Sequence, residues 1–330
     1  ALARICQKLS SWKSMTIQSA FEDALGTSAE AVYGEWQDSM RARYDDQVRS
    51  LGELRSGELL EDTEGFSNLH PALSPDGRKL AYLSTLKGHY AIHALVVRDL
   101  ESGEEEVVAR GVVSSPDWSP DGRRLLFVRK ERADRYGSRQ ADLYEYDTEG
   151  PERALPAKAV WFVPTTVRGY GPSALRVRRL TRGLRGLYPV YSPDGEWIAF
   201  VQNGGRSNNL GLMKADGTDV RVVTDFADGT QLYTPAFSPD GTRMALSVAK
   251  RGERDIVVID LDASMNPLRA RALVSTPGTD RDPSWSATGE ELAFASDVTG
   301  IFNIYSILSK DFGLILIKHY RNVSHLCRWG

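Results

Sequence analysis

The stretch Pro235-Ala-Phe-Ser-Pro-Asp-Gly241 decides the fold of this chain. Pro239 pre-sets the backbone angle at the second position of a type I turn, and Gly241 supplies the left-handed residue that ends it. A turn of this kind, followed by a left-handed glycine, joins two antiparallel strands in a short hairpin. Because apolar residues stand on both sides of the turn, the stretch predicts a buried β-hairpin.

The same hairpin signature recurs along the chain. Four copies read Ser-Pro-Asp-Gly, and a fifth, degenerate copy reads Ser-Ala-Thr-Gly; their glycines are Gly77, Gly122, Gly195, Gly241 and Gly289. Successive glycines are 45, 73, 46 and 48 residues apart. Three of these steps match the roughly 40–50-residue period of a four-stranded propeller blade. The long step predicts an insertion in the second blade.

The strand after each turn is apolar on both faces. One face carries mainly large residues, which are Leu80, Leu125, Ile198, Met244 and Leu292 and, two positions on, Tyr82, Phe127, Phe200, Leu246 and Phe294. The intervening position is mostly alanine: Ala81, Leu126, Ala199, Ala245 and Ala293. A sheet that is apolar on both sides must be covered on both sides. The large-against-small pattern fits wedge-shaped blades stacked around an axis.

Two further strands complete each predicted blade. Third strands are expected over 92–100, 142–147, 210–214, 255–261 and 302–307, and fourth strands over 106–109, 175–180 and 220–224. A parallel sheet would need helical crossovers between its strands. No segment of adequate length for a crossover stands between them, so the blades are predicted to be antiparallel.

The pattern Pro-x-aromatic-Ser-Pro-Asp-Gly-x-x-apolar-Ala-aromatic resembles the TolB-type, WD-like propeller repeat, over roughly residues 66–308. The resemblance implies an all-β propeller of four-stranded antiparallel blades, five of them recognisable and the last incomplete, with a small N-terminal α-helical segment. It also implies a bacterial envelope setting, periplasmic or extracellular, and a non-catalytic role. The sequence itself does not show a compartment, so a cytoplasmic location is the alternative.

Residues 1–52 are predicted to be helical. Thr27 and Glu30 have the spacing of a capping box, and an earlier helix over 15–25 would end at Gly26. Five residues then fall on one apolar stripe: Trp36, Met40, Tyr44, Val48 and Leu51. The segment is either the tail of an upstream zinc peptidase-like domain, as known arrangements around such propellers suggest, or a helical cap on the propeller. The His-Glu-x-x-His motif of that peptidase is absent.

Residues 53–330 are assigned to the propeller. Glu58–Asp62 resembles the last strand of a blade and is expected to pair with the final blade, which leaves no open edge. Residues 309–330 depart from the repeat. The chain begins without Met, and we expect it to be a fragment of a longer protein.

Composition excludes several classes of function. The net charge of -3 and pI near 6.0 argue against a general nucleic-acid binder. No apolar run approaches the roughly 18 residues of a membrane-spanning helix. Cys6 and Cys327 lack metal-ligand spacing, and His89 and His93 fall on a predicted strand without the glutamate of a zinc-peptidase motif. No metal, cofactor or Gly-x-Ser-x-Gly nucleophile is predicted.

The insertion at about 150–174 is the first candidate binding region, because loops on rigid scaffolds often carry binding. It exposes Trp161, Phe162 and Tyr170. Basic residues crowd around it: Arg123, Arg124, Arg129, Lys130, Arg132, Arg135, Arg139, Arg176, Arg178, Arg179, Arg182 and Arg185. Such a sector concentrates positive potential and favours an acidic partner; the alternative is a solvated strand face beside a packed loop.

The residue before each repeat proline is the second candidate. These residues are His70, Ser115, Tyr188, Thr234 and Asp282. If the first strand of each blade is innermost, they lie near one mouth of the channel and vary as a binding funnel would; a structural role at the strand start is the alternative. The leading hypothesis is a scaffold that binds a protein or peptide. The alternative is an accessory propeller that positions substrate for an upstream zinc metallopeptidase, and a propeller with its own channel chemistry ranks last.

Overall fold

The computed structural model describes residues 2–10, 16–50, 67–85, 92–130, 140–150 and 176–309. The chain divides into two compact units, Ala1–Arg55 and Ser56–Gly330. The predicted closing strand Glu58–Asp62, the insertion at 150–174 and residues 310–330 lie outside the described residues.

The N-terminal unit contains helices α1 (Leu2–Leu9), α2 (Ile17–Leu25) and α3 (Ala29–Ser50). Helix α2 ends as predicted at Gly26, whose φ of 74° is the left-handed conformation of a C-cap. The predicted cap at Thr27 is wrong. Helix α3 begins at Ala29, so Ser28 occupies the capping position and its Oγ accepts a hydrogen bond from Ala31 N at 3.1 Å.

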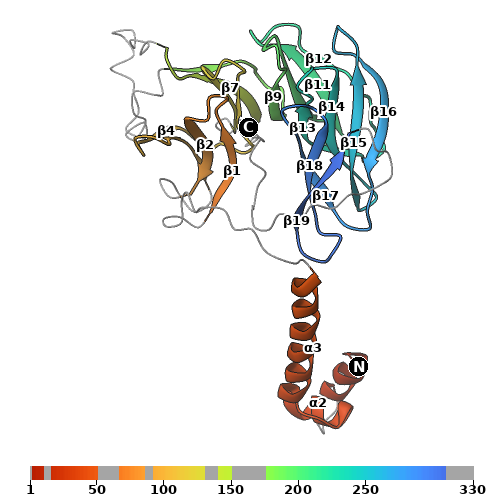
Figure 1. The fold of residues 1–330 in the computed structure, drawn as a ribbon. Coiled ribbons are helices and arrows are strands. Elements are labelled where there is room, and N and C mark those ends of the chain that lie inside the picture. Colours follow the sequence, from red (N-terminus) through yellow and green to blue (C-terminus); the bar gives the residue numbers. More distant parts are fainter. Residues whose placement is uncertain are drawn as a thin grey trace. The chain divides into compact units, whose positions relative to one another are not determined.

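The second unit contains five antiparallel sheets, and the predicted propeller of five blades is confirmed. Figure 1 shows the blades following one another from orange to blue. Their strands are β1 (Asn68–Leu73), β2 (Lys79–Ser84), β3 (Ala94–Asp99) and β4 (Glu105–Arg110); β5 (Asp117–Trp118), β6 (Arg124–Lys130), β7 (Ala141–Asp147) and β8 (Val177–Arg179); β9 (Gly186–Tyr191), β10 (Trp197–Asn203), β11 (Asn208–Lys214) and β12 (Arg221–Val222); β13 (Gln231–Phe237), β14 (Arg243–Lys250), β15 (Glu253–Leu261) and β16 (Pro267–Val274); and β17 (Asp280–Trp285), β18 (Glu291–Ser296) and β19 (Asn303–Leu308). The fifth blade has three strands within the described part of the chain.

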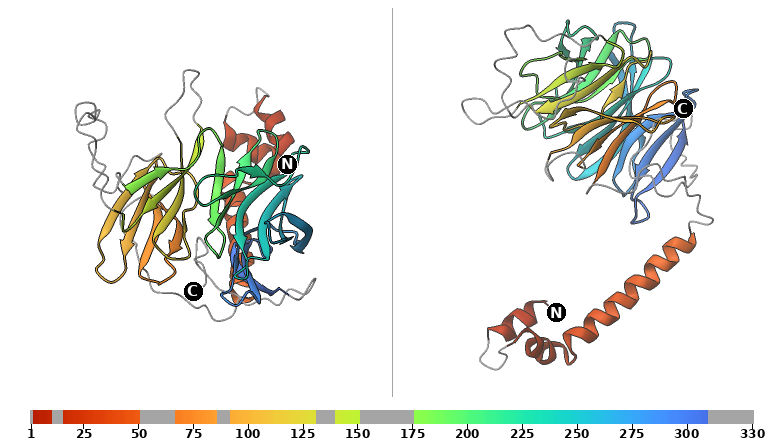
Figure 2. Two further views of the ribbon diagram at one scale, coloured as in Figure 1. Left: turned by 90° about the horizontal axis from the view of Figure 1, so that it is seen from above. Right: turned by 90° about the vertical axis from the view of Figure 1, so that its left-hand side faces the viewer.

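The first strands of the blades surround the axis. Strand β1 contacts β5, β5 contacts β9, β9 contacts β13, and β13 contacts β17. Within each blade the strands then run outward in sequence order (Figure 2). The first strand is therefore innermost, as the sequence argument required for a channel mouth.

The large and small faces pack as wedges, as predicted. Phe127 on β6 packs against Leu95 of the preceding blade, and Phe200 on β10 packs against Val128 of the blade before it. Both rings are fully buried. Each such ring contributes roughly 2–3 kcal/mol of hydrophobic stabilisation to the interface between blades.

The repeat turns also connect neighbouring blades. Trp118 Nε1 donates to Ala72 O of the preceding blade at 2.9 Å, and Trp285 Nε1 donates to Ala236 O at 3.1 Å. Within the turn, the Ser238 hydroxyl donates to Asp240 Oδ1 at 2.6 Å and accepts from Arg243 N at 2.9 Å. The serine and aspartate of the repeat therefore close the hairpin, a role that adds to those of its proline and glycine.

The predicted strand limits differ mainly at the outer edge. The fourth strand expected over 175–180 shrinks to β8, and that expected over 220–224 shrinks to β12. An outer strand has a partner on one side only, so few backbone hydrogen bonds specify its ends.

Candidate functional site

Four of the residues that precede a repeat proline share an unusual backbone conformation. His70, Tyr188, Thr234 and Asp282 have φ values of 54°, 51°, 42° and 55°. We call these four residues the strained ring. They are the third or fourth residue of β1, β9, β13 and β17, and the alternative of a structural role there stays open. Ser115 of the second blade lies before the short strand β5 and is not among the residues with positive φ.

A β-bulge places each member of the strained ring. Leu187 pairs with Val201 and Val190 with Ala199, so Tyr188 and its proline together oppose the single residue Phe200. The same two-against-one register occurs opposite Tyr82, Leu246 and Phe294. Such bulges re-aim side chains and are common beside binding and active sites.

The conformation is costly for these residue types. Left-handed backbone costs an L-residue roughly 1–2 kcal/mol, and glycine or asparagine avoids most of that cost. A following proline further disfavours the helical region of the residue before it. The cost is greatest at Tyr188 and Thr234, because histidine and aspartate adopt this conformation more readily, and the surrounding blades must offset it. Strain of this kind gathers at ligand sites.

Serines of the preceding blade support two of the strained residues. Tyr188 N donates to Ser114 Oγ at 3.2 Å, and Asp282 N donates to Ser247 Oγ at 3.1 Å. Both bonds cross from one blade to the next. The orientation of each strained residue is thus fixed by two blades, which preorganises the surface they form.

Aromatic and charged side chains adjoin the strained ring between blades three, four and five. The rings of Tyr188 and Tyr233 meet edge to face at 6.1 Å between centroids. The Arg254 guanidinium stacks over Tyr233 at 4.3 Å and lies 4.0 Å from an Asp282 carboxylate oxygen. Tyrosine and arginine are the residue types most enriched at energetically dominant contacts in protein interfaces.

Burial changes the ionisation of this cluster. It raises the pKa of the Tyr188 phenol, and it lowers the pKa of the Arg254 guanidinium although Asp282 acts in the opposite direction. The Arg254 side chain is 20% exposed, and its Nε has no hydrogen-bond partner among the residues described. Arg254 and Asp282 thus form a largely buried charged pair beside the two tyrosines.

The other end of the channel carries the repeat turns. A cavity of about 330 Å³ there is lined by residues from all five blades, among them Pro75, Pro120, Pro193, Pro239 and Ser286. The aromatic residues behind it are buried, as Trp118 and Trp285 are 1% and 6% exposed. This end therefore presents mainly proline, serine and alanine, with little of the charge found near the strained ring.

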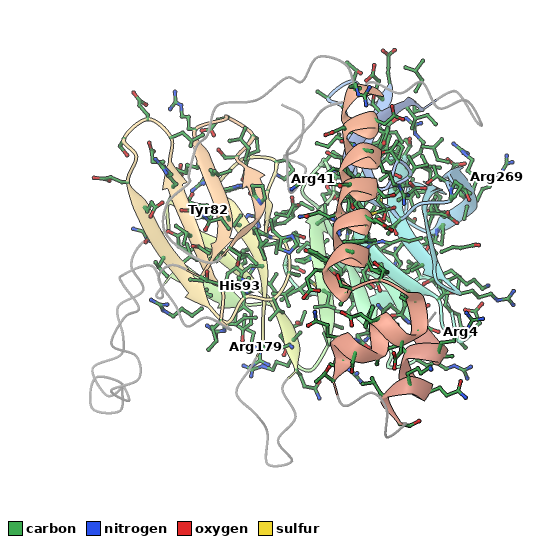
Figure 3. The ribbon with its side chains drawn as sticks, turned by 90° about the horizontal axis from the view of Figure 1, so that it is seen from below. Arg4, Arg41, Tyr82, His93, Arg179 and Arg269 are labelled. Atoms are coloured by element: carbon green, nitrogen blue, oxygen red, sulfur yellow. The ribbon has the colours of Figure 1, made fainter. Side chains whose placement is uncertain are left out.

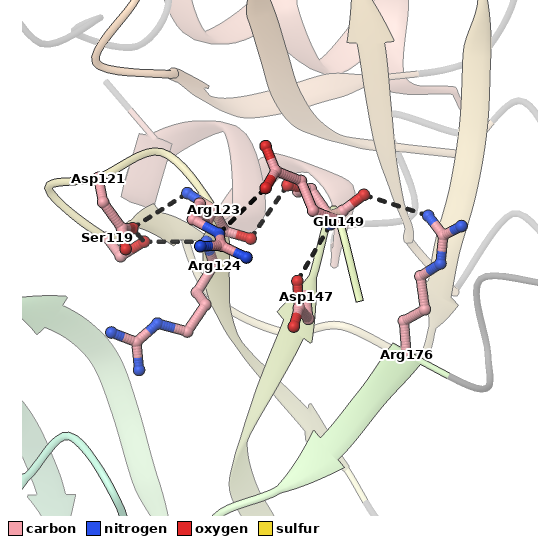
Figure 4. Close-up of polar contacts among 8 residues, drawn as sticks. Ser119, Asp121, Arg123, Arg124, Asp147, Glu149 and Arg176 are labelled. Atoms are coloured by element: carbon pink, nitrogen blue, oxygen red, sulfur yellow. Dashed lines mark hydrogen bonds and ion pairs between the residues drawn. The ribbon is translucent and has the colours of Figure 1, made fainter. Parts of the chain in front are cut away.

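Part of the predicted basic sector is paired with carboxylates. Arg178 and Arg124 lie 3.0 Å and 3.6 Å from Glu145, which is 7% exposed. Figure 4 shows Arg123 paired with Glu149 at 3.1 Å and Arg176 donating to the Thr148 backbone. These contacts neutralise much of the positive potential that the sequence suggested.

Arg179, labelled in Figure 3, is held by a buried carboxylate. Its Nη2 donates at 2.7 Å to Asp142, which is completely buried. Asp142 also accepts hydrogen bonds from Thr181 Oγ1 and from the backbone N–H groups of Gly183 and Leu184, each at 3.0 Å. Burial pushes the pKa of Asp142 up, but these donors outweigh it and the pKa lies below its ordinary value. Asp142 therefore organises the loop that enters β9.

The other predicted site residues have mixed outcomes. Trp161, Phe162 and Tyr170 lie outside the described residues and stay predictions. His89 is also outside them, and His93 precedes β3 rather than lying on a strand, with its Nε2 3.4 Å from Ser67 Oγ.

Sequence reasoning missed Tyr233, Arg254 and the bulges. The sequence feature that could have indicated Tyr233 is its position next to Thr234, a predicted channel-mouth residue. Arg254 is the second residue of β15, and nothing in the repeat pattern marked it.

Two general searches of the described residues give negative findings. They hold no group of three or more His, Cys, Asp or Glu side chains placed to bind a metal ion. None of the helices seen here is both long and apolar enough to cross a membrane.

Known proteins resemble the chain both in sequence and in fold. Residues 176–318 match the family model described as the TolB beta propeller domain. The Tol-Pal system protein TolB of Anaeromyxobacter dehalogenans (strain 2CP-C) is 30% identical over 132 residues, which cover 39% of this chain and 24% of that protein. The chain thus spans about a quarter of that relative's length.

Two longer matches extend the comparison across the blades. The uncharacterized protein Atu1656 of Agrobacterium fabrum is 32% identical over 234 residues, covering 67% of each protein. The crystal structure of TolB from Acinetobacter baumannii superposes with a TM-score of 0.53 at 22% identity, covering 74% of this chain and 52% of that one. The repeat, the blades and these matches agree, and the chain belongs to the TolB-like β-propeller proteins.

Proposed function

We propose that this propeller is a non-catalytic scaffold that binds a protein or peptide at the channel mouth formed by the strained ring. The observation that carries the proposal is the positive φ of four non-glycine residues at equivalent places in four blades. A purely structural bulge would be better served by glycine. We infer that the side chains of the strained ring have a binding role that offsets the cost of their backbone conformation.

The chemistry around the strained ring suits a polypeptide partner. Tyr188 and Tyr233 offer large surfaces that lose little conformational entropy on binding. Arg254 and Asp282 add a charged pair beside these rings. The blades hold these groups in place before binding, so association costs less ordering entropy.

The relatives suggest a setting for this partner. Since the curated TolB relative is named for the Tol-Pal system, we propose that the chain serves an envelope protein assembly and lies in the periplasm. The partner itself is not identified by these arguments.

Capture followed by direct titration tests the proposal. The purified chain is immobilised, captured proteins are identified by mass spectrometry, and each is purified and titrated calorimetrically against the free chain. The Tyr188→Ala/Tyr233→Ala double variant is expected to lose at least tenfold in affinity, since each ring belongs to the mouth. The Val222→Ala/Phe226→Ala variant is the control, because these exposed apolar residues lie at the outer edge of blade three.

One result with these two variants would contradict the proposal. If the mouth variant binds every titrated partner as tightly as the wild type while both variants unfold at the wild-type temperature, the mouth is not the binding surface.

A further inference from the structure

A second site lies between blades two and three, beside the strained ring but separate from it. A cavity of about 610 Å³ opens there. Its apolar lining includes Val113 and Leu187, and its polar lining consists of Lys130, Gln140, Arg185 and Asn203. Cavities of roughly 300–1,000 Å³ with an apolar lining and a few convergent polar groups are the usual size and composition of small-molecule sites.

The charge of the lining has one sign. Among the described residues that line the cavity, Lys130 and Arg185 are cations and none is a carboxylate. Neither cation has an ion pair recorded with any acidic residue in the described ranges, in contrast to the paired Arg123, Arg178 and Arg179. Lys130 and Arg185 are thus two cations of the basic sector that lack a carboxylate partner among the described residues and that line one cavity.

Arg185 is held in position by the loop before β9. The buried carboxylate of Asp142 accepts the N–H groups of Gly183 and Leu184, the two residues that precede Arg185. The Arg185 carbonyl accepts Asn203 N at 3.0 Å, which ties the loop to β10 within blade three. Arg185 itself has a φ of 58°, a strained conformation for a residue with a side chain. The backbone that carries the Arg185 side chain is thus fixed, and the planar guanidinium loses less entropy per hydrogen bond than a more flexible group would.

Asn203 adds a directed donor. Its Oδ1 accepts the Gly205 N–H at 2.9 Å, so the carbonyl end of the amide is occupied within its own turn. The amide Nδ2 is then the end available to a ligand, and it donates. Lysine and arginine side chains also only donate, so these three polar groups seek acceptors.

We propose that this cavity binds a small organic molecule through an oxyanion, a carboxylate or a phosphate group, held by Lys130, Arg185 and Asn203. The guanidinium fork matches both groups with two parallel hydrogen bonds. The apolar part of the ligand rests on Val113 and Leu187. The site does not depend on the proposed partner binding, because its lining contains no member of the strained ring.

Two probes and three variants test the site. Citrate and inorganic phosphate are each titrated into the purified chain by calorimetry at low ionic strength, and the titrations are repeated at higher salt. The wild type is expected to bind at least one probe, with affinity that falls as salt rises. Arg185→Gln and Lys130→Gln are each expected to weaken binding at least tenfold.

Arg251→Gln is the matched control. Arg251 is exposed, has a similar φ of 54°, and lies in the turn between β14 and β15, away from the cavity lining. Tighter binding of citrate assigns the site to organic carboxylates, and tighter binding of phosphate assigns it to phosphorylated ligands. Binding of neither probe overturns the proposal, as does equal weakening in Arg251→Gln and Arg185→Gln. Thermal unfolding of each variant verifies that the propeller is intact.

Discussion

Replacing Thr234 by asparagine tests whether the strained backbone at the channel mouth destabilises the fold and whether the Thr234 side chain contributes to binding. Thr234 has a φ of 42° and is followed by Pro235, so the structure holds a β-branched residue where its backbone is least favoured. Asparagine tolerates left-handed backbone much better. The substitution should therefore stabilise the fold while it removes a side chain from the proposed binding surface.

The expected gain is modest but measurable. Relief of left-handed strain contributes about 1–2 kcal/mol. The substitution loses a long contact between Thr234 Oγ1 and Ser247 Oγ at 3.4 Å, worth at most about 0.5 kcal/mol. The net stabilisation of about 1 kcal/mol corresponds to a rise of about 2–4 °C in unfolding temperature for a domain of this size.

The assay pairs thermal unfolding with partner titration. Unfolding is followed by circular dichroism, and affinity is measured with a partner identified by capture. Arg251→Asn is the control because Arg251 also has positive φ but lies outside the mouth. Both variants should unfold at a higher temperature than the wild type, and only Thr234→Asn should bind its partner more weakly.

Two results would refute the reasoning. A lower unfolding temperature for Thr234→Asn, with the expected rise for Arg251→Asn, would mean that the left-handed backbone at Thr234 is not strained. A higher unfolding temperature with unchanged affinity would mean that the strain serves no binding role.

Three further predictions concern the blades. Gly211→Ala should destabilise the fold by about 1–3 kcal/mol in chemical denaturation, because its new methyl group would overlap the buried Phe200 ring on the paired strand. Trp118→Phe should cost about 1–3 kcal/mol by leaving Ala72 O without its donor, and a wild-type unfolding midpoint would contradict this. The depressed pKa of Asp142 stabilises the fold above the ordinary carboxyl value of 3.8, and this contribution is lost as pH falls through the lower pKa of the folded state. Urea unfolding from pH 7 downward should therefore show the stabilities of the wild type and Asp142→Asn converging in acid; a constant difference would contradict the assignment.

The fold was predictable because local and global signals agree. The repeat turn, the alternation of large and small residues and the period all indicate one antiparallel blade. Buried positions such as Phe200 and Ala199 have little freedom, since each faces a neighbouring blade. The outer strands were predicted less well, because solvent covers one of their edges and tolerates several end points.

The sequence located the residues of the strained ring but did not predict their left-handed backbone conformation. The sequence shows a proline after Tyr188, and a residue before proline normally avoids the helical region and extends. Local propensity therefore predicts a plain strand start. In the structure the first strand carries one extra residue opposite Phe200, whose ring is buried between blades two and three. Tertiary packing overrides the local preference here.

The Lys130–Arg185 cavity was beyond sequence reasoning for a related cause. Lys130 ends β6, Arg185 precedes β9 and Asn203 ends β10, so only the stacking of two blades brings them together. The sequence shows only how many basic residues this sector has. The structure shows which of them have a carboxylate partner and which can contact a ligand. Arg178 and Arg185 stand in the same short stretch, yet Glu145 neutralises the first while the Asp142-bound loop presents the second. Both proposed sites thus lie at junctions between blades, where the repeat specifies the backbone and leaves the side chains free to differ.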